Sequence, residues 1–130
     1  MVQVDGPNND VGIIYSTSKW AFPDPVDSGG QKYDAGKPQV GIVLKDFSNA
    51  LMAVSELGTF GINKYGPSNW LKVPDALTRY TNAMGRHLLL EEIEGIDPET
   101  NMLHAVSTAW NALARLELII REQNGAESHE

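Results

Sequence analysis

Residues 74–94 read PDALTRYTNAMGRHLLLEEIE, and this stretch decides the fold class. Proline suits the first turn of a helix and aspartate suits the positive end of the helix dipole, so Pro74 and Asp75 predict a helix start. Apolar residues then recur at helical spacing to about Glu94. Gly95 follows directly, and glycine is the residue that most often ends a helix. The stretch therefore predicts one long amphipathic helix.

Two more segments with helical periodicity flank this stretch. Before it, Asp46 or Ser48 can cap a helix that fades towards Gly66. The apolar positions of that helix are Phe47, Ala50, Leu51, Val54 and Leu57. After it, Asp97-Pro98-Glu99 predicts the start of a third helix, which reaches about Glu122. Three helices joined by short loops predict an all-α bundle.

The two ends of the chain differ from this helical part. Residues 1–36 contain several turn-forming combinations of glycine, proline, asparagine and aspartate, and they lack helical periodicity. We expect an extended or flexible N-terminal arm here, in which residues 11–15 could form one short strand. Residues 37–122 are expected to form the helical domain, and residues 123–130 a polar tail.

The composition limits the class of protein. A chain of 130 residues with 42% hydrophobic and 21% charged residues is typical of one globular domain. Cysteine is absent, so disulfides and thiolate metal sites are excluded, and no apolar run approaches the roughly 18 residues of a membrane span. A formal net charge of −7 gives no electrostatic gain on nucleic acid backbones. We therefore expect a soluble, cytoplasmic protein that binds neither nucleic acid nor membranes.

The helix predicted over residues 74–94 carries polar side chains on its apolar side. At about 100° per residue, His87, Glu91 and Glu94 fall in the same sector as the apolar residues. Charged groups on such a face cost free energy unless they are paired or bound to a metal. Either the helix end frays and the acids are solvated, or they contribute to a metal or phosphate site between helices. Arg79 and Arg86 flank this sector and could hold phosphate oxygens or pair with surface acids.

The third predicted helix carries a polar stripe opposite its apolar residues. The stripe consists of His104, Thr108, Asn111 and Arg115. A face exposed to solvent explains it, and it becomes a binding site only if another subunit or the N-terminal arm covers it.

The loop over residues 61–70, GINKYGPSNW, mixes hydrogen-bond donors, a cation and aromatic rings. Loops of this composition often bind flat, charged ligands such as a nucleotide base with its phosphates. Tyr65 and Trp70 could equally close the end of the bundle.

Several short motifs occur in a characteristic order along the chain. They are Lys32-Tyr33-Asp34-Ala35-Gly36-Lys37-Pro38, Phe60-Gly61-Ile62-Asn63-Lys64-Tyr65-Gly66 with Asn69-Trp70, Arg79-Tyr80 leading into Arg86-His87, and Asp97-Pro98-Glu99 followed by His104 and Asn111. In order and spacing, over about residues 32–122, they resemble a phage-borne family of dATP/dGTP diphosphohydrolases. That family is related to the all-α MazG-like nucleotide pyrophosphohydrolases. The resemblance implies a MazG-like helical bundle after an extended arm, with the nucleotide bound within residues 37–122.

The resemblance also implies an activity and a set of site residues. The activity is hydrolysis of a purine deoxynucleoside triphosphate to the monophosphate and pyrophosphate, with Mg²⁺ or Mn²⁺ bound by carboxylates. The implied metal ligands are Glu56, Glu91, Glu94, Asp97 and Glu99, of which Glu91, Glu94 and Asp97 are also the catalytic candidates. The implied nucleotide contacts are Lys37, Lys64, Asn69, Trp70, Arg79, Arg86, His87, His104 and Asn111.

Two alternatives to an enzyme are open. The acidic signature of MazG-like enzymes is present only loosely, whereas the basic and aromatic loop is intact. A phage protein that binds and sequesters a nucleotide signal of host immunity, without catalysis and in the host cytoplasm, is therefore one alternative. A structural or interaction domain is the other. Because three helices in under 80 residues bury little surface alone, a homo-oligomer, either a dimer or a tetramer, is expected.

Overall fold

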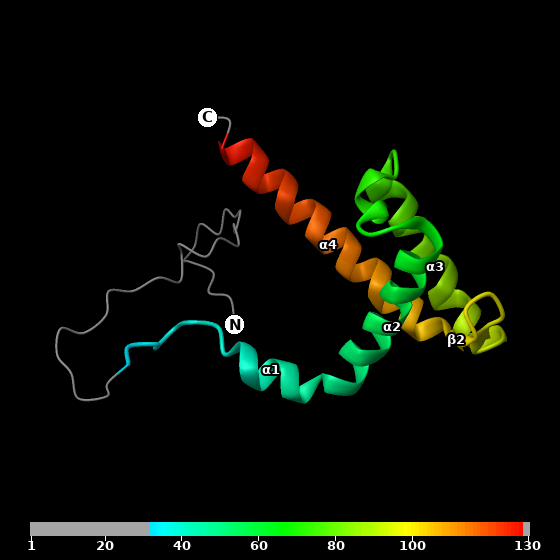
Figure 1. Ribbon diagram of the computed structural model, residues 1–130, viewed down its shortest axis with the longest axis horizontal. Helices are drawn as coiled ribbons and strands as arrows, with labels where there is room; N and C mark the ends of the chain where they lie inside the picture. Colours follow the sequence, from blue (N-terminus) through cyan, green and yellow to red (C-terminus); the bar gives the residue numbers. More distant parts are fainter. Residues whose placement is uncertain (1–31, 129–130) are drawn as a thin grey trace.

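The computed structural model describes residues 32–128 (Figure 1). Within this range the order of elements is α1 (Val40–Asp46), α2 (Ser48–Tyr65), the 3-10 helix η2 (Asn69–Lys72), α3 (Ala76–Ile93), β1 (Ile96–Asp97), β2 (Met102–Leu103) and α4 (His104–Ser128). The strands form a single two-residue pairing, so the predicted all-α class is confirmed. None of the described helices is long and apolar enough to cross a membrane. Residues 1–31, which include most of the predicted arm and its strand at residues 11–15, lie outside the described residues, as do residues 129 and 130.

The helices form two regions that differ in how closely they pack. α3 packs along the first half of α4, and α2 packs against α4 beside it. In contrast, α1 and the start of α2 curve away from these helices, and the second half of α4 projects beyond the end of α3 (Figure 1). The packed region therefore lies where α2, α3 and the first half of α4 meet.

A tight hairpin joins α3 to α4, and it corrects the predicted start of the third helix. The helix begins at His104, because β1 and β2 pair Ile96 with Leu103 and Asp97 with Met102. Asp97 holds the turn between the strands: its Oδ1 accepts the backbone N–H of Glu99 at 2.9 Å, and its carbonyl accepts the N–H of Asn101 at 2.7 Å. Aspartate before proline starts turns as readily as it starts helices, and the spacing does not distinguish the two.

The bounds of the helices can also be compared with the expectations. α3 begins and ends where the sequence predicts, with Gly95 at a positive φ of 69° after its last turn. α1 was not predicted, since its sequence VGIVLKD contains a glycine and β-branched residues that disfavour helix. Neither Asp46 nor Ser48 caps α2; Phe47 occupies the cap position, without a side-chain cap bond. α4 continues past the predicted end at Glu122 to Ser128.

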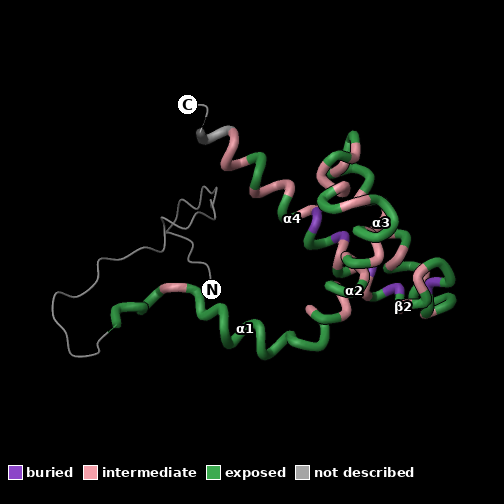
Figure 2. The backbone as a smooth tube through the Cα atoms, in the orientation of Figure 1, coloured by how far each residue is buried: buried purple, intermediate pink, exposed green. Residues whose placement is uncertain are grey.

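Burial along the described residues is the reverse of a usual core. Ala114 is the single buried apolar side chain among the residues whose burial the structure describes, whereas Asp97, His104, Ser107 and Asn111 are all buried. Figure 2 shows these buried positions on the hairpin and the first half of α4. Half-buried apolar side chains of α2, α3 and α4 complete the interior. The interior of this region is therefore polar to an unusual degree.

Candidate functional site

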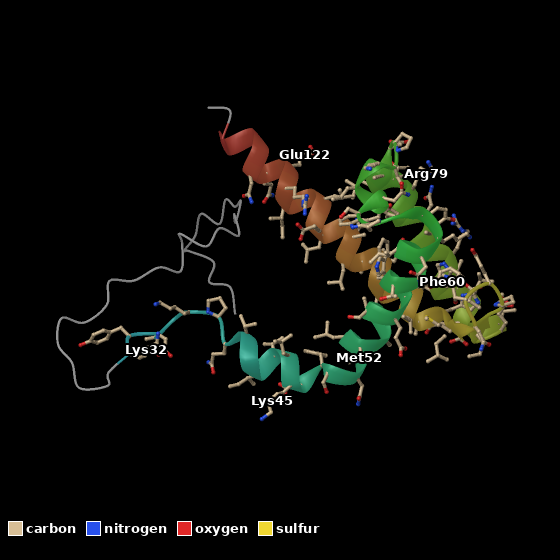
Figure 3. The ribbon with its side chains drawn as sticks, viewed as in Figure 1. Lys32, Lys45, Met52, Phe60, Arg79 and Glu122 are labelled. Atoms are coloured by element: carbon tan, nitrogen blue, oxygen red, sulfur yellow. The ribbon has the colours of Figure 1, made fainter. Side chains whose placement is uncertain are left out.

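A cavity of about 760 Å³ lies where α2, η2, α3, the hairpin turn and α4 meet. Such a volume is within the range of pockets that bind small ligands. Figure 3 shows Phe60 of α2 and Arg79 of α3 in the packed region, both of which line the cavity, whereas Lys32 and Lys45 lie on the distant segment around α1.

One part of the cavity wall is an aromatic cluster of Trp70, Tyr80 and Trp110. The ring centroids are 5.7 Å apart for Tyr80 and Trp110, 5.8 Å for the two tryptophans, and 6.2 Å for Trp70 and Tyr80. The Tyr80 hydroxyl donates a hydrogen bond of 2.7 Å to the carbonyl of Trp70, which ties η2 to α3. Burial raises the pKa of Tyr80, so the phenol stays neutral and keeps this bond. The cluster offers flat apolar surface suited to a base.

Arg79 and Arg86 supply positive charge to the same cavity. Both side chains are exposed residues of α3 on its wall. Two other cations of the packed region have partners of their own: Arg115 donates to Thr81 Oγ1 at 2.7 Å, and Lys64 pairs with Glu99 at 2.9 Å. The bond to Glu99 raises the pKa of Lys64, and a bond with Tyr65 adds to the shift.

His87, Asp97 and His104 bring two imidazoles and a carboxylate together. One potential ligand atom from each side chain lies within 4.8 Å of the others. The Nδ1 atoms of the two histidines are 2.9 Å apart, and His104 Nε2 lies 3.0 Å from Glu94 Oε2. The His104 side chain is only 2% exposed.

The electrostatic surroundings keep His87 neutral. Burial lowers the pKa of its imidazole, the charge on Asp97 opposes this shift, and His104 and Arg86 add to it. His87 and Asp97 both line the cavity, so they can accept a proton from a bound molecule or coordinate a cation there.

The polar stripe of α4 lies inside the bundle, which corrects the expectation of a solvated face. His104 contacts His87 of α3, Arg115 contacts Thr81 of α3, and Asn111 is only 6% exposed. The opposite, apolar face is the more exposed one, with Leu113 and Leu116 about half exposed. The stripe therefore faces α3 of its own chain.

The structure brings many of the residues implied by the resemblance to one place, but not all. Those that line the cavity are Asn69, Trp70, Arg79, Arg86, His87, Asp97, Glu99 and Asn111. His104 adjoins this wall through its contact with His87, and Glu94 in turn contacts His104. Lys64 is bound to Glu99, whereas Glu56 and Glu91 are exposed and Lys37 precedes α1, so that none of these four lines the cavity.

Sequence reasoning did not name several polar or aromatic residues of the cavity wall as site residues, among them Tyr80, Thr100, Ser107 and Trp110. Ser107 is 4% exposed, and its carbonyl accepts a hydrogen bond of 2.8 Å from Asn111 Nδ2. A signal for Ser107 was present, since it lies three residues after His104 and four before Asn111 and so shares their helical face.

Comparison with known proteins identifies the family. The model of the family described as dATP/dGTP diphosphohydrolase, N-terminal, matches residues 27–128. The chain belongs to this family. The resemblance drawn from the short motifs is thereby confirmed, and the family name points to nucleotide hydrolysis. No curated protein and no solved structure gave a match.

Proposed function

We propose that this protein hydrolyses purine deoxynucleoside triphosphates, dATP or dGTP, to the monophosphate and pyrophosphate in the cavity between α2, α3 and α4. The observation that carries the proposal is that one cavity of a dATP/dGTP diphosphohydrolase family member combines an aromatic cluster, two arginines and a neutral histidine beside a carboxylate.

The cavity offers a separate partner for each part of a nucleotide. The base packs against Trp70 and its aromatic neighbours, where the edge of the base can also form hydrogen bonds with Asn69. Arg79 and Arg86 are seven residues apart on α3, two helical turns, and bind the phosphate oxygens. This arrangement holds the triphosphate along α3, with the phosphates beside His87 and Asp97.

The reaction needs a water molecule that attacks the α-phosphorus. A new bond forms between the water oxygen and phosphorus, the bond to the β-phosphate oxygen breaks, and pyrophosphate leaves with that oxygen. Asp97 or neutral His87 takes the proton of the attacking water, because both reach the cavity. The arginines offset the charge on the leaving pyrophosphate.

The divalent ion implied by the resemblance can be tested against the donors present. Mg²⁺ prefers oxygen ligands, and of the five acids implied as ligands only Asp97 and Glu99 line the cavity. Glu99 is engaged by Lys64. The remaining cluster contains two imidazole nitrogens, which suit Mn²⁺ better than Mg²⁺. The residues present therefore fit Mg²⁺ poorly.

The experiment is incubation of the purified chain with each of the four dNTPs and with cyclic dinucleotides, with and without Mn²⁺. Released pyrophosphate is measured, and bound ligand is recovered after denaturation. We expect pyrophosphate from dATP or dGTP. Unchanged ligand recovered from the protein would instead support a protein that sequesters nucleotides, and the absence of both would overturn the proposal.

Two variants sharpen the assignment of the site. Asp97→Asn and Glu94→Gln keep the shape of each side chain and remove its charge, and each should lower turnover at least tenfold. Glu91→Gln is the matched control, because Glu91 is an exposed acid of α3 that does not line the cavity. Full activity in both the Asp97 and Glu94 variants would contradict the assignment.

We also infer that a second copy of this chain covers the apolar surface of α1 and the start of α2. Val40, Ile42, Val43, Leu44, Phe47 and Met52 are all between 52% and 64% exposed. A helix as short as α1 is not stable alone in water, and monomers rarely expose so large an apolar patch. In a chain of net charge −7, residues 40–55 carry only Lys45 and Asp46, so two copies meet here without like-charge repulsion.

A further inference from the structure

His87, Asp97 and His104 form a cluster of polar side chains of which two, Asp97 and His104, are buried. His104 is 1% exposed and Asp97 is 9% exposed, and the hairpin between α3 and α4 places both residues. Asp97 ends β1, and His104 begins α4 directly after β2, with its N–H donating to the carbonyl of Gly95 at 2.8 Å. Burial of such groups costs free energy unless each of them has a partner.

The contacts of His104 define how its ring is protonated. The Glu94 carboxylate only accepts hydrogen bonds, so His104 Nε2, at 3.0 Å from Glu94 Oε2, carries a proton and donates it. In the neutral ring, Nδ1 is then left with a lone pair. This lone pair accepts a hydrogen bond of 2.9 Å from His87 Nδ1, and a metal ion between the two nitrogens would replace that proton.

A histidine that binds a metal through one nitrogen usually donates its other N–H to a carboxylate, which fixes the ring and its tautomer. His104 and Glu94 form this arrangement, with Nδ1 left to face His87. Two nitrogens bound to one ion at about 2.1 Å are roughly 3.0 Å apart at a right angle, close to the separation of the two Nδ1 atoms.

The donors also select the kind of ion. We propose that His87, Asp97 and His104 form a binding site for one first-row transition-metal ion, such as Mn²⁺, Co²⁺, Ni²⁺ or Zn²⁺, in preference to Mg²⁺. Imidazole suits these ions, whereas Mg²⁺ takes oxygen ligands and retains its waters. The three potential ligand atoms lie within 4.8 Å of one another.

This site lies beside the cavity of the proposed function but does not depend on it. His87 and Asp97 line the cavity, so an ion held there adjoins any ligand phosphate that Arg86 binds. When bound, it would supply positive charge to phosphate oxygens and lower the pKa of a bound water. Metal binding by these three side chains requires no nucleotide, so the two proposals can fail separately.

The test is calorimetric titration of the chelator-treated full chain, carrying no histidine tag, with Mg²⁺, Mn²⁺, Co²⁺, Ni²⁺ and Zn²⁺ in separate runs. We expect one ion per chain and affinities that rise from Mn²⁺ through Co²⁺ to Ni²⁺. Mg²⁺ should bind at least tenfold more weakly than Mn²⁺. Visible absorption of the Co²⁺ form gives a second readout, since its bands report nitrogen ligands.

The variants separate a metal site from a chain of hydrogen bonds that only stabilises the fold. His87→Gln and Asp97→Asn should each weaken Co²⁺ binding more than tenfold, and Glu94→Gln should weaken it by about 10–100-fold. Glu91→Gln on the same helix should bind as the parent chain does. Far-UV circular dichroism checks that each variant is folded.

The proposal is overturned if Mg²⁺ binds as tightly as Mn²⁺, if folded His87→Gln and Asp97→Asn chains bind Co²⁺ unchanged, or if none of the ions binds. An ion that binds at these residues without any turnover of dNTPs would remove the proposed enzyme activity and leave the metal site intact.

Discussion

The first half of α4 and the segment formed by α1 with the start of α2 differ in opposite ways from an ordinary small domain. Along α4, the residues that face α3 are polar and buried, as His104, Ser107 and Asn111 are. Along α1, the residues are apolar and exposed, as Val43 and Phe47 are. Figure 2 shows this contrast between the packed region and the curved segment.

The two regions of this chain have different physical requirements. Buried polar groups need partners, and here the partners are side chains around a cavity, which is the arrangement of a binding site. Exposed apolar groups need a cover, which for α1 we infer to be a second copy. The buried polar groups around the cavity give the site its specificity for a ligand. Burial of the apolar surface of α1 by a second copy gives much of the stability that the interior of one chain does not supply.

The largest expected effect concerns the apolar segment. Phe47→Asp places a charge in the surface that a second copy covers, and an unpaired buried charge costs several kcal/mol. The variant should dissociate the oligomer and leave the bundle folded, because aspartate is well suited to the cap position that Phe47 occupies before α2. Light scattering at micromolar concentration measures the mass, and Phe47→Leu should assemble normally. A parent chain that is already monomeric there would contradict the inference.

The second effect concerns the buried polar end. His104→Ala removes the largest fully buried side chain and leaves Glu94 and His87 without their partner. We expect a loss of about 2–4 kcal/mol in the free energy of unfolding, from the cavity and the unpaired groups together. Leu89→Ala is the comparison, since Leu89 is 71% exposed and should cost under about 1 kcal/mol. If urea denaturation shows the same loss of unfolding free energy for both variants, the conclusion that the polar His104 is buried while the apolar Leu89 is exposed would be wrong.

Prediction from the sequence is correct for helices whose ends are marked by start and stop residues. It is wrong where one pattern of residues fits two structures. α3 was predicted correctly because proline, aspartate and glycine mark its ends and apolar residues fill its span. The start of α4 was wrong, because Asp97-Pro98 suits a turn as well as a helix start. α1 was missed, since its sequence contains a glycine and three β-branched residues, which disfavour helix.

The site shows the same division. Asn69, Trp70, Arg79 and Arg86 were named from the sequence and lie on one cavity wall. The prediction of a solvated polar stripe on α4 assumes that the apolar residues face inwards, an assumption that fails along this helix. The approach of His104 to His87 depends on how the hairpin folds α4 back along α3, and no short-range pattern contains that information.

The third effect concerns the cavity itself. Arg86→Ala removes charged hydrogen bonds to phosphate worth about 1.5–3 kcal/mol, and nucleotide affinity should fall by about 10–100-fold. Arg121→Ala is the matched control, because Arg121 pairs with Glu117 on the exposed surface of α4 and does not line the cavity. Fluorescence titration with dATP, with Mn²⁺ absent, measures both. If the Arg86 variant binds dATP with unchanged affinity, the proposal that the phosphates bind along α3 would be wrong.

The smallest effect tests whether the two regions are coupled. Gly41 lies in α1 and Gly85 in α3, and a Cβ added at either would meet nothing within 4 Å. Replacing a glycine inside a helix with alanine stabilises that helix by roughly 0.5–1 kcal/mol. Gly85→Ala should raise the free energy of unfolding by about this amount at any protein concentration, because α3 packs along α4 and unfolds with it. Gly41→Ala should raise it only where the chain is assembled, since α1 of a single chain curves away from the bundle and can melt independently. Urea denaturation of both variants, above and below the concentration at which the parent chain dissociates, distinguishes these cases. A gain from Gly41→Ala in the monomer would show that α1 is part of the cooperative unit of one chain, and the division into two regions would then be wrong.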